Sequence, residues 1–365
     1  MAMATAKTPR DSVGIAMVVR SRISTGRFPI GHLLPPIRVL GKEFEVSHET
    51  VRRAMKFLEG KRLVEAAARR GFRVVRRPKD PEKVVPAAYV MSSSDGVWHG
   101  IEQQLLVQLQ SVAADSGFSV AGISASARSA RDVAEQLQAA RVSGVVLDTD
   151  DPALVAVVEE LGLPTVMVES ASPAGRFDSV IQDGFGGGVQ AGEHLVERGH
   201  KRIGWVGPIA KSFQGLQRWG GAVAGLKRHG LGLDPRLIID SNPEEDPVGQ
   251  IQDALAGADR PTAIIALWRP EAIAAGRAAA RLGLRIGRDL DIVGWVAEEN
   301  YAEYVTAFPE GQLPAAVTWR IRSLAEAAMA RLAERRRRPG LPAMRMVVET
   351  RLRLGVGNRL ARRAP

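Results

Sequence analysis

From residue 87 onward, short apolar runs alternate with longer stretches of helical periodicity. The predicted strands are 87–91, 118–123, 144–147, 165–168, 202–207, 263–267 and 291–295. The predicted helices include 100–115, 130–140, 152–161, 187–198, 219–229, 247–256 and 271–282. Apolar strands joined by helices build parallel sheets that are covered on both faces. We therefore expect an α/β fold of two lobes, with ligands binding in the cleft at the carboxyl ends of the strands.

The positive charge of the chain is concentrated before this α/β region. Residues 1–80 carry 18 Lys/Arg and 7 Asp/Glu, whereas the remaining residues carry 32 and 33. Such concentration in one small module is typical of a domain that binds a polyanion. A solvated basic surface would also explain the charge, so sequence motifs are needed to distinguish it from a polyanion-binding domain.

Composition excludes several classes of function. The chain has no cysteine, which rules out disulfides, thiolate metal sites and cysteine nucleophiles and fits a reducing compartment. No signal-peptide core or run of 18 apolar residues is present, so we expect a cytoplasmic protein without membrane contact. The six histidines form no recognisable catalytic or metal motif, and we expect no enzyme activity, cofactor or metal site.

The basic module contains the parts of a winged helix-turn-helix. Apolar periodicity predicts helices from residue 12 to 25, from Pro36, and from Ser47, whose hydroxyl can cap the third helix. The third helix has a polar first turn and a basic flank, as in a recognition helix. Residues 63–65 and 72–75 then predict a two-stranded hairpin with a basic tip at Arg69 and Arg70.

The stretches "GRFPIGHLLPPIRVL", "VSHETVRRAM", "LEGKRLVE" and "RRGFRVV" resemble the GntR type of bacterial transcription regulators. The resemblance implies that Arg38 and Arg52 contact phosphates or base edges and that Gly71 lets the wing approach the minor groove. It places Ser47, His48 and Thr50 at the groove-facing start of the recognition helix. Arg53 and Arg70 complete the candidate DNA-binding set, which is Arg38, Ser47, His48, Thr50, Arg52, Arg53, Arg70 and Gly71.

Two departures from that family affect the base preference. The family usually has arginine at His48 and glycine at Arg69. Imidazole cannot make the bidentate guanine contact that arginine makes. The resemblance therefore does not determine which bases this helix reads. Ser47 could also be only a cap, and Arg53 only solvated surface.

The segment 76–86, "RRPKDPEKVVP", is rich in proline and charge and predicts a semi-rigid linker. We therefore expect a DNA-binding domain at 1–75, a linker at 76–86, an effector-binding domain at 87–355 and a tail at 356–365.

The α/β region resembles the effector-binding domain of LacI/GalR regulators, which is similar to periplasmic sugar-binding proteins. The strongest match is "DSVIQDGFGGGVQAGEHLVERGHKRIGWVGP", followed by "RWGGAVAGLKRHGL", "PTAIIAL", "LGLRIGRDLDIVGW" and "MVVETRLRLG". With the GntR-type head, the arrangement is similar to the arabinose-repressor kind of fusion. The resemblance of the α/β region to LacI/GalR regulators implies a two-lobed, periplasmic-binding-protein-like (type I) domain with parallel sheets.

The resemblance also implies where an effector binds. Arg218 matches an arginine that commonly bonds effector hydroxyls or carboxylates, and Trp295 ends a strand that faces the cleft. From the residues themselves, the loop after the first strand offers hydroxyl, carboxylate and aromatic groups. The candidate effector-binding residues are Ser92, Ser94, Asp95, Trp98, Arg218, Glu271 and Trp295.

Two features of this region depart from a sugar or nucleotide site. The family usually has an acidic pair after the glycine at Gly294, where this chain has Val296 and Ala297, so an effector with an apolar or anionic part becomes plausible. The glycines at 184–188 lack the spacing of a dinucleotide motif, and we expect them to serve helix packing, with Asp183 as the helix cap.

Three functions were weighed on these grounds. The first is a ligand-responsive transcription regulator, a repressor, that acts as a homodimer on two-fold related half-sites of an operator. Its effector would be a small molecule such as a carbohydrate. The second is a cytoplasmic small-molecule binding protein without regulatory DNA function, and the third is an enzyme on a Rossmann-like scaffold, for which no catalytic set is present.

Overall fold

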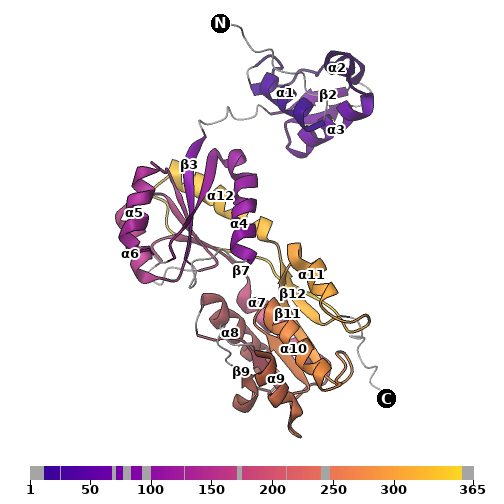
Figure 1. The fold of residues 1–365 in the computed structure, drawn as a ribbon. Coiled ribbons are helices and arrows are strands. Elements are labelled where there is room, and N and C mark those ends of the chain that lie inside the picture. Colours follow the sequence, from indigo (N-terminus) through magenta and orange to yellow (C-terminus); the bar gives the residue numbers. More distant parts are fainter. Residues whose placement is uncertain are drawn as a thin grey trace. The chain divides into compact units, whose positions relative to one another are not determined.

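The computed structural model describes residues 12–24, 26–67, 71–76, 84–92, 100–126, 128–170, 175–210, 212–239 and 247–355. The chain divides into two compact units, Met1–Val84 and Val85–Pro365 (Figure 1). No helix among the described residues is long and apolar enough to cross a bilayer.

The first unit is a three-helix bundle with a hairpin. It contains α1 (Ser12–Ser24), α2 (Ile37–Phe44), α3 (His48–Gly60), β1 (Val64–Ala67) and β2 (Gly71–Val74). Its core consists mainly of Ile15, Val19, Ile23, Leu40, Phe44, Val51, Met55 and Leu58. The hairpin is antiparallel, with Val64 opposite Val74. The predicted winged helix-turn-helix is confirmed.

The turn between α2 and α3 depends on two local devices. Glu45 adopts the left-handed conformation with a φ of 55°, and its backbone N–H donates to the carbonyls of Gly41 and Lys42. Ser47 then caps α3, because its Oγ accepts from the Thr50 N–H at 3.2 Å. Ser47 is therefore the predicted cap.

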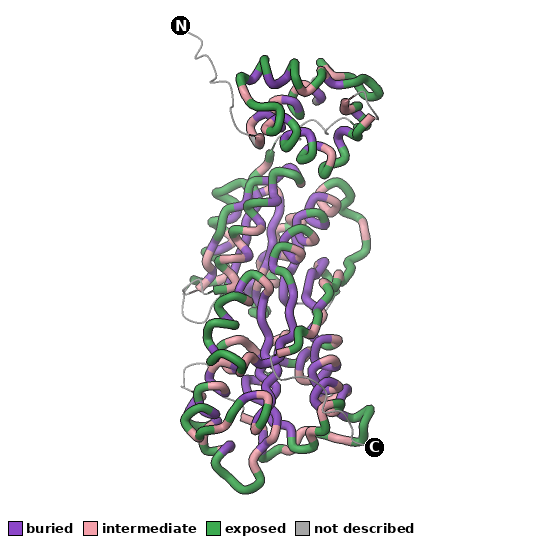
Figure 2. The backbone as a smooth tube through the Cα atoms, turned by 90° about the vertical axis from the view of Figure 1, so that its right-hand side faces the viewer, coloured by how far each residue is buried: buried purple, intermediate pink, exposed green. Residues whose placement is uncertain are grey.

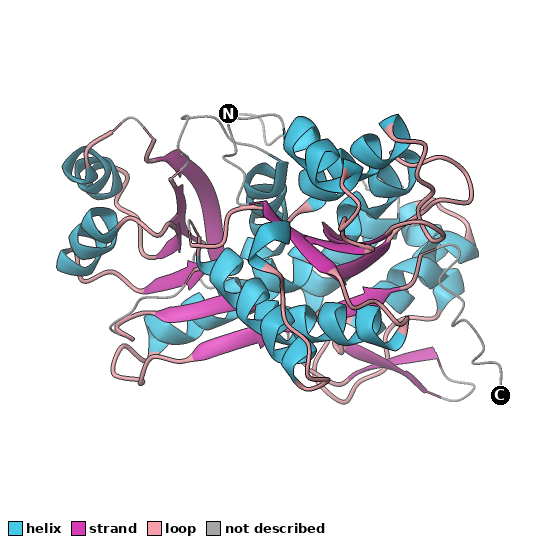
Figure 3. Cartoon of the chain, turned by 90° about the horizontal axis from the view of Figure 1, so that it is seen from below, coloured by secondary structure: helices cyan, strands magenta, loops and turns pink. Residues whose placement is uncertain are grey.

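The second unit is an α/β structure. Its described strands form two six-stranded sheets, in the orders β13-β7-β6-β5-β3-β4 and β14-β12-β11-β10-β8-β9. Among the described pairs within these sheets, only β12 and β14 are antiparallel. Helices lie on both faces of the sheets (Figure 3), and buried residues follow the strands (Figure 2). The predicted parallel α/β fold with two lobes is confirmed.

The first lobe contains the first of these sheets. Its elements are β3 (Val85–Met91), α4 (Gly100–Ala113), β4 (Phe118–Ser124), α5 (Ala130–Ala139), β5 (Val145–Asp148), α6 (Pro152–Glu160), β6 (Thr165–Val168), β7 (Asp178–Gln182), α12 (Ile321–Arg337) and β13 (Arg345–Val348), with the short η1 (Ala114–Ser116). Strand β3 starts at Val85, inside the range predicted for the linker. Helix α12 returns from the second lobe and packs on this sheet and α4.

The second lobe contains the other sheet. Its elements are α7 (Gly184–Glu197), β8 (Ile203–Val206), α8 (Phe213–Lys227), β9 (Ile238–Ile239), α9 (Pro247–Ala256), β10 (Ala263–Ala266), α10 (Arg269–Arg281), β11 (Asp291–Ala297), α11 (Tyr301–Thr306), β12 (Ala315–Trp319) and β14 (Arg351–Arg353), with the short η2 (Pro235–Leu237) and η3 (Glu298–Asn300). The chain passes between the lobes after β7, after β12 and after β13. Three crossings fit a hinged pair of lobes.

Glycines let α7 and α8 pack with their backbones in close approach. A Cβ atom at Gly188 would lie 2.3 Å from the Arg218 carbonyl oxygen, and one at Gly221 would lie 2.0 Å from the Phe185 carbonyl oxygen. Asp183 caps α7, with Oδ1 accepting from the Gly186 N–H at 2.8 Å. The packing predicted for the glycine run is confirmed, and it fixes the position of α8, which carries Arg218.

Candidate functional site

The first unit presents a basic, exposed surface on α3. The Arg52 and Arg53 side chains are 58% and 71% exposed, and both lie beside Glu49, with N–O distances of 3.3 and 3.5 Å. Exposed ion pairs of this kind are weak, so both arginines can exchange Glu49 for a phosphate. Arg38 is exposed on α2.

The first turn of α3 is polar and ordered by the cap. The hydroxyls of Ser47 and Thr50 lie 2.8 Å apart. His48 is exposed, and its ring passes close to α2, since a Cβ atom at Gly41 would lie 3.2 Å from its Cδ2. Gly71 starts the wing strand with a φ of 98°, which favours glycine. Arg70 lies outside the described residues.

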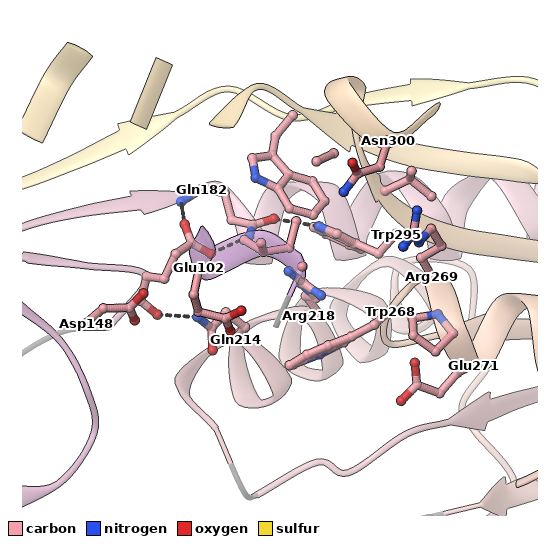
Figure 4. A pocket seen from close by; sticks show the side chains of 17 residues that line it. Glu102, Asp148, Gln182, Gln214, Arg218, Trp268, Arg269, Glu271, Trp295 and Asn300 are labelled. Carbon is pink, nitrogen blue, oxygen red and sulfur yellow. Dashed lines mark hydrogen bonds between the residues drawn. The ribbon is translucent and has the colours of Figure 1, made fainter. Parts of the chain in front are cut away.

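A pocket of about 370 Å³ lies between the two lobes of the second unit (Figure 4). That volume suits a molecule of the size of a monosaccharide or a purine. The first lobe contributes Gly100, Ile101, Glu102, Asp148, Glu169 and Gln182, and the second contributes Gln214, Arg218, Trp268, Arg269, Pro270, Glu271, Trp295, Val296, Ala297, Asn300 and Trp319.

Arg218 lies among three tryptophans. Its guanidinium carbon is 4.3 Å from the Trp295 ring centroid, 5.1 Å from that of Trp268 and 5.6 Å from that of Trp319. Figure 4 shows Arg218 between Trp268 and Trp295. The side chain is 4% exposed, and Nη1 donates to the Leu267 carbonyl at 2.6 Å. The aromatic faces hold the cation by cation–π attraction.

Burial lowers the pKa of Arg218 to about 9, and the nearby Glu169 and Glu271 carboxylates oppose that shift. The guanidinium is therefore still charged at neutral pH. Burial also raises the pKa of Glu271, which the charge of Arg218 partly offsets.

Acidic side chains dominate the opposite side of the pocket. We call Glu102, Asp148 and Glu169 the first-lobe wall; they come from the first turn of α4, the end of β5 and the residue after β6. Asp148 Oδ2 accepts from the Tyr89 hydroxyl at 2.6 Å. Desolvation, opposed by the hydrogen bond from Tyr89 and aided by the negative charges of Glu102 and Glu169, raises the pKa of Asp148 to about 8. Desolvation also raises the pKa of Glu169.

A hydrogen-bonded chain connects the first-lobe wall to the tryptophans. Gln182 Nε2 donates to Glu169 Oε2 at 2.5 Å, and Trp295 Nε1 donates to Gln182 Oε1 at 2.5 Å. Gln214 of α8 also donates to the Glu169 carbonyl at 2.5 Å. Glu169 is thus fixed from two sides and exposes little of its surface.

Two further hydrogen bonds cross between the lobes. Gln104 Nε2 of α4 donates to Asn300 Oδ1 at 2.7 Å, and the Phe213 N–H donates to Asp150 Oδ2 at 3.3 Å. A ligand that contacts both lobes would strengthen or replace these links, so ligand binding can change the angle between the lobes.

Several buried polar atoms around the pocket have no hydrogen-bond partner among the described residues. They include Arg218 Nε, Trp268 Nε1, Glu271 Oε2 and Trp319 Nε1. A buried polar group without a partner costs about 1–3 kcal/mol. A ligand with donors and acceptors would satisfy these atoms.

The predicted effector residues lie in different places. Arg218, Glu271 and Trp295 line the pocket. Ser92 is exposed and is not among the described residues that line it. Ser94, Asp95 and Trp98 lie outside the described residues.

Sequence reasoning missed several pocket residues, namely Glu102, Asp148, Glu169, Gln182, Gln214, Trp268, Asn300 and Trp319. Asp148 carried a usable signal, because it directly follows a predicted strand and carboxyl ends of parallel strands meet at one edge. Trp319 carried none, because its strand was not among those predicted.

Comparison with known proteins finds a match within each unit. Residues 12–74 match the bacterial regulatory proteins of the gntR family, and residues 193–355 match the periplasmic binding protein-like domain. The HTH-type transcriptional repressor PurR of Salmonella paratyphi B is 30% identical over 172 residues, which are 46% of this chain and 50% of that protein. The chain thus spans about half the length of the curated relatives it matches.

Solved structures of LacI-family regulators share the fold of the second unit. A LacI family transcriptional regulator from Mycobacterium smegmatis is 26% identical with a TM-score of 0.61, over 74% of this chain and 98% of that one. A regulatory protein of LacI family from Chloroflexus aggregans is 23% identical with a TM-score of 0.66, over 74% and 98%. Both of these proteins are described as regulators. The chain therefore contains a segment that matches the gntR family at residues 12–74 and one that matches the periplasmic binding protein-like domain at residues 193–355, and its second unit is similar to LacI-family regulators of known structure.

Proposed function

We propose that this protein is a ligand-responsive, sequence-specific DNA-binding transcription regulator, a repressor whose operator affinity changes when a small molecule binds between its two lobes. Residues 1–75 bind DNA, residues 76–86 link the units, and residues 87–355 bind the effector. The tail at 356–365 has no assigned role. Because its partner is DNA, we place the protein in the cytoplasm.

The observation that carries this proposal is the presence of two binding surfaces of different chemistry in one chain. The first unit exposes arginines beside a capped helix of recognition type. The second encloses a pocket around which several buried polar atoms have no hydrogen-bond partner within the described part of the chain. A cytoplasmic binding protein without regulatory function would have no use for the first surface.

On DNA, the polar first turn of α3 would enter the major groove and the arginines would contact the phosphates. A homodimer would place two such helices on half-sites related by two-fold symmetry. An effector that changes the angle between the lobes would alter the spacing of the two helices. Couplings of this kind are typically about 1–3 kcal/mol.

The proposal is tested with the purified full chain and a library of genomic fragments. Binding is measured by fluorescence anisotropy at several salt concentrations, with random duplex of equal length as the control. We expect a few fragments to bind at least a hundredfold more tightly than random duplex. Equal affinity for all fragments would contradict sequence-specific regulation.

A further inference from the structure

The buried polar atoms of the pocket that have no partner are mostly hydrogen-bond donors. Among the described residues that line it, the donors Arg218 Nε, Trp268 Nε1 and Trp319 Nε1 have no acceptor. Within the same described lining, Glu271 Oε2 is the one buried side-chain acceptor that has no donor. A buried N–H group needs an acceptor. A ligand of this pocket must therefore bring acceptor atoms.

The three donors lie close together on the second lobe. Trp268 lies just after β10 and Trp319 ends β12, and the parallel strands β10, β11 and β12 are neighbours in one sheet. The Arg218 guanidinium carbon is 5.1 Å from the Trp268 ring centroid and 5.6 Å from that of Trp319. These side chains are therefore close enough for one ligand to contact all three.

Acceptors on the first-lobe side of the pocket already have donors. Glu169 accepts from the backbone N–H of Gln182 at 3.3 Å and from its side chain at 2.5 Å, and Gln182 Oε1 accepts from Trp295. Asp148 Oδ2 accepts from the Tyr89 hydroxyl. Since the pKa of Asp148 is about 8, this carboxyl group is mostly protonated at pH 7 and adds an O–H donor. These residues therefore offer little to the hydroxyl hydrogens of a polyol.

Charged groups that line the pocket compensate one another. The carboxylates of Glu169 and Glu271 attract the Arg218 guanidinium and oppose the lowering of its pKa by burial. Arg269 pairs with Glu303. An ionic ligand would lose its hydration without gaining an unpaired charge of opposite sign. The lining thus favours a ligand without net charge.

The second lobe also gives the pocket flat apolar surfaces. The rings of Trp268, Trp295 and Trp319 line it, and Figure 4 shows Trp268 and Trp295 on the two sides of Arg218. Pro270 and Val296 add aliphatic surface on the same lobe. A flat ring buries more apolar area against such surfaces than a ring that carries hydroxyl groups on both faces.

We propose that the effector is a flat, uncharged ring compound with two or more acceptor oxygens and at most one hydrogen-bond donor, and that its acceptors face Arg218, Trp268 and Trp319. This inference rests on the proposed function and names its ligand class. A polyol sugar would bring a donor with every hydroxyl group, and most of these donors would stay without an acceptor in the pocket.

The test uses small uncharged compounds that differ in flatness and in hydrogen bonding. Coumarin and 1,3-dimethyluracil are flat and have oxygens that only accept. In 2-naphthol and resorcinol, which are also flat, the oxygens are hydroxyl groups. Glucose and myo-inositol are polyols. Binding to the full chain is measured by isothermal titration calorimetry at pH 7. We expect the flat acceptors to bind on the order of tenfold more tightly than the flat hydroxyl compounds and the polyols.

The outcomes separate this inference from the proposed function. Flat hydroxyl compounds or polyols that bind as tightly as the flat acceptors would overturn the ligand class and leave an effector pocket in place. Failure of all the compounds to bind would also overturn the ligand class. The proposed function is then judged separately, by whether a bacterial metabolite extract changes the affinity of the chain for its best genomic fragment.

Substitutions test the two indole donors. Trp268→Phe and Trp319→Phe keep an aromatic ring and remove the N–H, so each should lower coumarin affinity about fivefold and leave 2-naphthol affinity nearly unchanged. The matched control is Trp219→Phe, since Trp219 packs edge-on against Trp205 with ring centroids 5.2 Å apart and is not among the residues that line the pocket.

Two results with these variants would overturn the proposal. One is full coumarin affinity in both pocket variants. The other is an equal loss of affinity for coumarin and 2-naphthol, which would assign the effect to lost ring area. The Tm of each unliganded variant shows that it is folded, and the comparison of compounds on the wild-type chain does not depend on the variants.

Discussion

The guanidinium carbon of Arg218 lies 4.3 Å from the ring centroid of Trp295. The indole N–H of Trp295 in turn donates to Gln182, which donates to Glu169 on the opposite lobe. A positive group in the second lobe and a carboxyl group in the first lobe are therefore positioned by one connected set of side chains. Movement of either lobe must rearrange this set.

Replacement of Arg218 by methionine should separate ligand binding from stability. We expect Arg218→Met to keep its free energy of unfolding within about 1 kcal/mol of wild type, because loss of the Leu267 bond is offset by removal of a desolvated charge. Affinity for the effector should fall at least tenfold. Denaturant unfolding and calorimetry measure the two effects, and a large loss of stability with intact ligand affinity would contradict the role given to Arg218.

Replacement of Asp148 should change how stability depends on pH. The pKa of Asp148 is about 8 in the folded protein, against an ordinary value of 3.8. The folded protein thus holds a proton that the unfolded chain releases, so this contribution to stability is complete below about pH 4 and is lost as the pH rises toward 8. Asp148→Asn removes that loss.

The measurement is the difference in Tm between Asp148→Asn and wild type across pH 5 to 9. The difference should shift in favour of the variant up to about pH 8 and then level off. His194, whose pKa is lowered by burial, contributes a slope of opposite sign that is present in both proteins and cancels. A difference that does not vary with pH would show that Asp148 titrates normally.

The close approach of α7 and α8 should make Gly221 intolerant of a side chain. A Cβ atom there would lie 2.0 Å from a backbone oxygen, so Gly221→Ala should cost about 3 kcal/mol of stability. Gly249→Ala is the matched control on α9, where a Cβ atom would meet nothing within 4 Å and alanine should add about 0.5–1 kcal/mol. Equal Tm values for the two variants would contradict the described packing.

Removal of the Arg52 charge should weaken DNA binding on all sequences. We expect Arg52→Ala to lower affinity on the order of tenfold and to reduce the slope of log affinity against log salt by about 0.9, as for one lost phosphate contact. Arg131→Ala is the control, since it removes an 87% exposed arginine from α5 of the second unit. If Arg52→Ala left the slope of log affinity against log salt unchanged, Arg52 would not contact a DNA phosphate.

The sequence was sufficient to predict many of the elements but neither all of them nor how they converge. Strand β6 matches its predicted range, and the others have shifted ends, because apolar runs mark buried strands clearly. The cap roles of Ser47 and Asp183 were also predictable, since capping is a local interaction. Helix α12 was not among the helices predicted, although it covers the first sheet.

The pocket was only partly predictable, because it depends on strand order and on the meeting of two lobes. Asp148 and Glu169 follow β5 and β6, which are neighbours in the sheet. Sequence spacing does not say that these strands are adjacent or that the second lobe brings Trp319 opposite them. The loop after β3 was favoured instead, and its described residue Ser92 is exposed.

The central claim is that one chain couples DNA binding to a ligand in the pocket. The most direct test is the affinity of the purified chain for its best genomic fragment, measured with and without a bacterial metabolite extract, in wild type and in Arg218→Met. We predict that the extract changes wild-type affinity by about 5- to 150-fold and leaves that of the variant unchanged. An affinity that responds equally in both proteins, or in neither, would contradict the account.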